Sequence, residues 1–172
     1  MAAVAAGAGV ALAVAAAGGT YALLNSQAVA AAAVTLTSGD ASLAVTTALS
    51  LPTTALYPGA TVSGSAVVKN TGTIPLKLRV TGLTLSGGAT SFSGALTVGV
   101  AAGASAAACS GGFTPEWTGV FASAPAAELS TTLAAGASVF FCVSAALPTG
   151  APDAARGSSA ASFAVLIDGR QL

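Results

Sequence analysis

The sequence contains no histidine, and only 6 % of its 172 residues carry a charge. An ordinary soluble domain has about 25 % charged residues. Most zinc sites use histidine or several cysteines, and serine or cysteine nucleophiles usually need an imidazole base. The lack of histidine therefore removes the usual zinc sites and catalytic triads from consideration, and we expect neither catalysis nor a cofactor.

Neither sign of charge dominates, because five Lys and Arg balance five Asp and Glu. The sequence thus lacks the basic patch that phosphate binding needs, and we expect no nucleic-acid partner. The five carboxylates show no acid–base pair spacing and no calcium-like clustering, so we interpret them as turn and surface residues. They are Asp40, Glu116, Glu128, Asp153 and Asp168. A carboxylate-only enzyme stays open as an alternative, and two buried carboxylates within about 10 Å in a cleft would support it.

The N-terminal segment carries no charge before Asp40. Residues 2–17 are apolar apart from two Gly, which is short for a membrane span of about 20 residues. A short apolar run followed by small residues is typical of a signal peptide, and Thr20-Tyr21-Ala22 places small residues at the cleavage site. We predict a signal peptide over residues 1–22, cleaved after Ala22, with Gln27-Ala28 as a second site. A retained signal anchor stays open, and it would be the chain's only contact with a membrane.

Residues 23–172 have the pattern of an antiparallel β-protein. In 75–85, Leu76, Leu78 and Val80 alternate with polar residues, which predicts a half-buried strand. Residues 61–85 predict a hairpin with the loop NTGTIP. Residues 138–144 are apolar on both faces, as in a central strand.

Further strands are expected in 94–103, in 127–148 and in 158–171, where Phe163, Val165 and Ile167 alternate with their neighbours. Residues 114–129 predict only a loop with one short helix or strand. Turn signals about every ten residues indicate an all-β sandwich in one domain.

Cys109 and Cys142 are the only thiols. In an exported chain, an even number of cysteines predicts a disulfide. Closing a loop between residues 33 positions apart should contribute roughly 3–4 kcal/mol. A redox or metal pair is the alternative, although the CxxC spacing is absent.

Three stretches carry a resemblance to known exported proteins. GGTYALLNSQA resembles the signal end of proteins processed by SipW-type signal peptidases. LYPGATVSGSAVVKNTGTIPLKLRV (56–80) is similar to the core of the TasA/camelysin family, and SFAVLIDGRQ (162–171) to its closing strand. The resemblance covers about half of the chain and leaves out both cysteines. It implies a jelly-roll or immunoglobulin-like sandwich, export to a bacterial cell surface, and assembly of some members by donor-strand exchange. Camelysin's protease label is not carried over, since HExxH is absent.

Residues 28–37 (AVAAAAVTLT) are an uncharged strand candidate directly after the predicted cut. Their alternate side chains would suit a donor strand that completes a neighbour's sheet, and these are Ala28, Ala30, Ala32, Val34 and Leu36. The alternative is that this segment forms the first strand of its own sandwich.

Two functions follow as hypotheses. The first is a secreted, non-catalytic subunit of a fibre or biofilm matrix, whose partners are copies of itself or other surface proteins. The second is a monomeric extracellular adhesion or binding module, in which Trp117, Phe113 and Tyr57 line a carbohydrate or peptide surface. For Trp117 the other interpretation is a core residue beside the disulfide.

Overall fold

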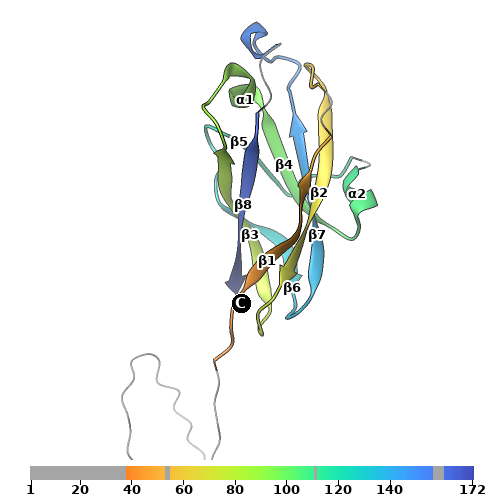
Figure 1. The fold of residues 1–172 in the computed structure, drawn as a ribbon, viewed down its shortest axis with the longest axis vertical. Coiled ribbons are helices and arrows are strands. Elements are labelled where there is room, and N and C mark those ends of the chain that lie inside the picture. Colours follow the sequence, from red (N-terminus) through yellow and green to blue (C-terminus); the bar gives the residue numbers. More distant parts are fainter. Residues whose placement is uncertain (1–37, 53–54, 111, 157–160) are drawn as a thin grey trace, which may run out of the picture. The chain divides into compact units, whose positions relative to one another are not determined.

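The computed structural model describes residues 38–52, 55–110, 112–156 and 161–172. In these ranges the chain is mostly β-structure, as the alternating pattern predicts (Figure 1). The strands are β1 (Leu43–Ser50), β2 (Thr61–Asn70), β3 (Leu76–Leu85), β4 (Thr97–Gly103), β5 (Trp117–Val120), β6 (Ala127–Leu133), β7 (Ser138–Ala146) and β8 (Phe163–Gln171). The short helices are α1 (Ser91–Ala95), α2 (Ala106–Ser110) and the 3-10 turn η1 (Asp153–Ala155).

Both N-terminal predictions lie outside the described residues. These are the signal peptide with its cleavage after Ala22, and the donor strand with Ala28, Ala30, Ala32, Val34 and Leu36. Across the ranges that are described, no helix combines the length and the apolar character that crossing a membrane requires.

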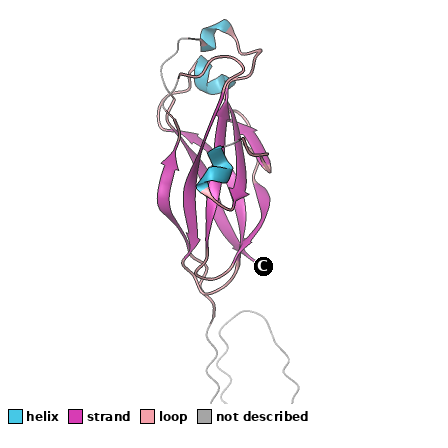
Figure 2. Cartoon of the chain, turned by 90° about the vertical axis from the view of Figure 1, so that its right-hand side faces the viewer, coloured by secondary structure: helices cyan, strands magenta, loops and turns pink. Residues whose placement is uncertain are grey.

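The strands form two antiparallel sheets in a sandwich-like arrangement (Figure 2). One sheet has the order β1-β2-β7-β4-β5, and the other has the order β6-β3-β8. One hydrophobic core takes side chains from both sheets, which shows that the sheets pack face to face. Its buried members are Ala66, Val68, Leu78, Val80, Val98, Val100, Trp117, Leu129, Leu133, Phe141 and Val143.

Three strand predictions are confirmed in detail. In β3 the side chains of Leu76, Leu78 and Val80 are buried, whereas the polar residues between them are half-buried. Strand β7 lies in the middle of the five-stranded sheet, between β2 and β4, as its apolar faces predict. In β8, half-buried residues at 163, 165 and 167 alternate with exposed ones. The region 114–129, expected to hold one short element, contains β5 and the start of β6.

The predicted hairpin over residues 61–85 is wrong, although both of its strands exist. Strand β2 belongs to the five-stranded sheet and β3 to the three-stranded sheet, so NTGTIP crosses between the sheets. The physical reason is the fully buried Asn70. Its amide donates to the carbonyls of Ile74 (2.7 Å) and Leu133 (3.0 Å), and its side-chain oxygen accepts from the Gly72 amide. These bonds satisfy backbone groups at the crossing and hold the loop against β6, in the other sheet.

Candidate functional site

The strand pairs are nested along the chain. Strand β4 pairs with β5, β3 with β6, and β2 with β7. The next pair in this series would be β1 with β8. Instead β1 pairs with β2, and β8 pairs only with β3 among the described strands. The side of β8 that faces away from β3, here called the β8 edge, therefore offers backbone donors and acceptors to another strand.

The other three edge strands carry features that discourage further pairing. Strand β1 has two register shifts in its ladder with β2, and β5 is only four residues long. Bulges and short edge strands are two ways in which proteins protect sheet edges. Strand β8, by contrast, pairs through nine consecutive residues, and the irregularity of that ladder lies in β3, between Val80 and Gly82.

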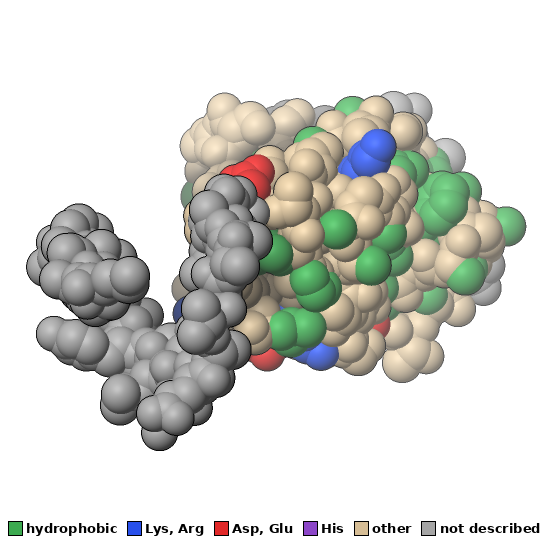
Figure 3. All heavy atoms as spheres, turned by 90° about the horizontal axis from the view of Figure 1, so that it is seen from below, with side chains coloured by type: hydrophobic (Ala, Val, Ile, Leu, Met, Phe, Trp, Pro, Cys, Tyr) green, Lys and Arg blue, Asp and Glu red, His purple; other side chains and the backbone are tan. Residues whose placement is uncertain are grey.

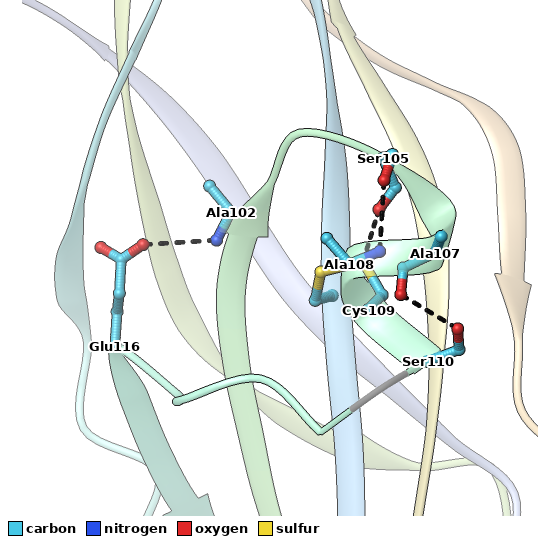
Figure 4. The surroundings of a disulfide bond; sticks show 8 residues. Ala102, Ser105, Ala107, Ala108, Cys109, Ser110 and Glu116 are labelled. Atoms are coloured by element: carbon cyan, nitrogen blue, oxygen red, sulfur yellow. Dashed lines mark hydrogen bonds between the residues drawn. A yellow bond between two sulfur atoms is a disulfide. The ribbon is translucent and has the colours of Figure 1, made fainter.

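The edge of β6 is closed by charged side chains. The β3–β6 ladder has a register shift between Thr132 and Glu128 of β6, and Ser130 lies within it. There the Ser130 amide donates to a Glu116 carboxylate oxygen at 2.7 Å, and the Ser130 carbonyl accepts from Lys77 Nζ at 2.9 Å. The other Glu116 oxygen accepts from the Ala102 amide at 3.4 Å, across β4 (Figure 4). Glu116 thus links the two sheets and occupies backbone groups that a further strand would use.

Glu116 remains ionised in this position. Desolvation is the largest single influence and raises the pKa of its carboxyl group. The hydrogen bonds from Ser130 and Ala102, together with the charge of Lys77, outweigh desolvation and lower that pKa below its ordinary value. This role differs from the turn or surface position expected for Glu116, and the available signal was its place directly before the short strand β5.

The β8 edge itself is apolar over its first half. Phe163, Val165 and Ile167 pack partly against the core, and Leu166 on the other face is 43 % exposed. Figure 3 views the domain from the end where β8 finishes and shows scattered Lys, Arg, Asp and Glu side chains among mostly neutral ones. No charged residue occurs in β8 before Asp168. An incoming strand would therefore meet backbone and apolar side chains in this half.

The charged residues of β8 lie in its second half and are paired. Arg79 Nε donates to Asp168 at 2.9 Å, and its Nη2 forms a second bond to the same carboxylate. This bidentate bond lowers the pKa of Asp168 and raises that of Arg79. Arg170 lies 3.9 Å from Glu128.

The structure brings only some of the five carboxylates near one another. Glu128 and Asp168 line one open hollow with Lys77 and Arg170, but both are substantially exposed and paired with arginine. They do not meet the condition of burial that a carboxylate-only enzyme required. Asp40 lies before β1, and Asp153 in η1 pairs with Arg156 at 3.3 Å. Within the described ranges, no three His, Cys, Asp or Glu side chains are arranged to hold a metal ion.

The predicted disulfide between Cys109 and Cys142 is present, with the two Cα atoms 4.9 Å apart. Cys142 lies in β7 between Phe141 and Val143, which face the core, so its own side chain is on the outer face of the sheet. There it joins Cys109 of α2, and both cysteines are buried. The disulfide therefore fastens the five-residue helix α2 onto the outer face of the five-stranded sheet (Figures 2 and 4).

The three aromatic residues proposed for a binding surface do not lie together. Trp117 is 4 % exposed and belongs to the core, where its indole N–H donates to the Pro125 carbonyl at 2.7 Å. It packs on the opposite face of the sheet from the disulfide, which corrects the expectation that the two are neighbours. Phe113 lies in an outer-face hollow, and Tyr57 is 70 % exposed and does not line that hollow.

Comparisons of the chain with protein-family models, with curated proteins and with solved structures find no match. The resemblance to the TasA/camelysin family therefore stays a prediction from sequence motifs. The β8 edge and the outer face around α2 are the two features from which function can be inferred.

Proposed function

We propose that the protein is a secreted, non-catalytic structural subunit that assembles with copies of itself by donor-strand exchange. The observation that carries this proposal is the β8 edge, which pairs with no other strand in the described part of the chain. We interpret the nested pairs β2–β7, β3–β6 and β4–β5 as part of a jelly roll, in which the first strand would lie beside the last. Because β1 pairs with β2 instead, a donor strand would occupy the position beside β8.

Residues 28–37 have the composition that this position requires. They carry no charge and no proline, so every residue can join a backbone ladder. Alternate small side chains, ending in Val34 and Leu36, would meet the apolar half of β8. Backbone hydrogen bonds would supply affinity, and the alternate side chains would set the register.

Export is part of the same proposal. A buried disulfide is typical of proteins that mature in oxidising compartments, and the apolar residues 1–22 have the pattern of a signal peptide. With no net charge, long-range repulsion between copies is small. Other matrix proteins that offer a similar uncharged strand are alternative partners for the β8 edge.

The test compares two substitutions in the proposed donor within a chain of residues 23–172. Val34→Asp places a charge among the side chains proposed to face the neighbour's core, whereas Thr35→Asp places it on the opposite face of the strand. We expect fibres of the unsubstituted chain and of Thr35→Asp by electron microscopy, and monomers of Val34→Asp.

Hydrogen exchange identifies the edge that is used. On assembly, amides of β8 that face away from β3 should become protected. Persistent monomers of the unsubstituted chain would refute assembly, and fibres in which β8 gains no protection would refute the role of the β8 edge.

A further inference from the structure

A second hollow lies on the outer face of the five-stranded sheet, opposite the face that forms the core. Its volume is about 280 Å³, and its floor spans strands β2, β7, β4 and β5. The segment between α2 and β5 forms one wall with Phe113 and Pro115. We call this hollow the neutral groove, because none of its lining residues carries a charge.

The floor of the neutral groove presents a row of small residues in register. Ser63, Ser144, Gly99 and Thr118 lie directly opposite one another on successive strands. The groove's hydroxyl groups belong to Thr61, Ser63, Thr97, Thr118 and Ser144. Within the described part of the chain, none of these hydroxyls has a protein hydrogen-bond partner. Each can donate one hydrogen bond and accept two, so the floor can serve a ligand rich in hydroxyl groups.

The wall of the neutral groove is held in place from two sides. Pro115 packs directly onto Gly99, where an added Cβ would come within 2.6 Å of the proline ring. On the other side, the disulfide fastens α2, which precedes the wall segment. The half-buried Phe113 thus offers an apolar surface beside the five hydroxyl groups of the floor, which we call the hydroxyl row.

We propose that the neutral groove binds a sugar ring of an uncharged polysaccharide. A sugar ring combines an apolar C–H face, which would pack against the Phe113 ring, with hydroxyls that would pair with the floor. The mixture of one aromatic wall and a few convergent polar groups is what small-ligand sites commonly show. The lack of charge in the lining disfavours anionic sugars, whose charge would be left without a partner.

This site goes beyond the proposed assembly and does not depend on it. The neutral groove and the β8 edge belong to different sheets, so sugar binding can be measured whether or not the protein forms fibres.

The experiment titrates the ¹⁵N-labelled chain, carrying Val34→Asp where the unsubstituted chain forms fibres, with neutral tetrasaccharides of glucose, of mannose and of N-acetylglucosamine, and with an acidic tetrasaccharide. At least one neutral sugar should cause saturable NMR shifts at the amides of Gly99, Thr118 and Ser144. Phe113→Ala should weaken that binding at least tenfold, and Thr118→Val, which keeps the side-chain shape but removes the hydroxyl, about threefold.

Tyr57→Ala is the matched control, because it also removes an aromatic ring but lies outside the groove. It should bind as tightly as the unsubstituted chain. If none of the neutral sugars bound saturably, the proposal would be overturned. An equal affinity of Phe113→Ala and the unsubstituted chain, or equally tight binding of the acidic sugar, would overturn it as well.

Discussion

Replacing Cys109 and Cys142 together by alanine should destabilise the domain by about 4 kcal/mol. The sequence separation of 33 residues gives an entropic contribution of about 3.7 kcal/mol in the chain-entropy model. Loss of two buried sulfur atoms adds a smaller packing term, because both side chains are fully buried. Fraying of the released helix α2 returns some entropy to the folded state, which reduces the total destabilisation. Against a typical stability of 5–15 kcal/mol, this change would be large.

The assay is equilibrium unfolding in urea, followed by tryptophan fluorescence. The chain has a single tryptophan, and Trp117 lies in the core shared by both sheets, so its emission reports global unfolding. The midpoint of Cys109→Ala/Cys142→Ala should fall relative to the oxidised protein. The m-value of the variant, which is the slope of its unfolding free energy against urea concentration, should rise, because the unfolded chain without the cross-link exposes more surface.

A difference below about 1 kcal/mol would refute this reasoning, because the chain-entropy model would then fail for this loop. Hydrogen exchange of the double variant supplies the structural check. Amides of α2 should lose protection first, whereas amides of β7 and β2 should keep theirs, since their ladder is continuous over nine residue pairs. Equal loss of protection in β7 would show that the disulfide supports the sheet rather than the helix.

Three other changes have expected outcomes. Asn70→Ala should cost about 3 kcal/mol in urea unfolding, because it leaves two backbone carbonyls and one amide without their buried partner. Gly64→Ala should destabilise by about 2 kcal/mol, because an added Cβ would lie 1.8 Å from a backbone oxygen of β1, whereas Gly82→Ala, with no atom within 4 Å, should change little. Since Arg79 lowers the pKa of Asp168, the pair stabilises the fold above about pH 4, and that stability is lost as the pH falls through the lowered pKa. In Arg79→Gln the free energy of unfolding should therefore fall less steeply as the pH is lowered below about 4. The same steepness in the variant and the unsubstituted chain would show that Arg79 does not lower the pKa of Asp168.

The strands could be predicted from sequence more reliably than their partners. The alternation in β3 and the two apolar faces of β7 are local properties, and the structure reproduces both. The hairpin over 61–85 failed because turn residues between two strands do not tell whether the strands share a sheet. That choice involves Asn70, whose bond to the Leu133 carbonyl forms only when β6 is in place, whereas its bond to the Ile74 carbonyl is local.

The candidate sites required long-range information. The even number of cysteines predicted their disulfide, but it did not predict that the disulfide fastens a helix to the outer face of a sheet. Among the described strands, the side of β8 that faces away from β3 has no partner because β1 pairs with β2, which no pattern within β8 can reveal. The hydroxyl row of the neutral groove was visible as Thr and Ser at alternate positions of β2. Its meaning depends on the register with β7 and β4.

The distribution of charge connects the two proposed sites. The strands of the five-stranded sheet contain one charged residue, Lys69, whereas those of the three-stranded sheet contain five. Those five are Lys77, Arg79, Glu128, Asp168 and Arg170. They lie on β6, on β3 and in the second half of β8, so the first half of β8 stays neutral. A strand that carries no charge can then pair there without desolvating an ion, and a neutral sugar can bind on the opposite sheet for the same reason. The charges of the described strands thus lie away from the surfaces where we propose binding, and Lys77 together with Glu116 satisfies backbone groups of Ser130 in β6.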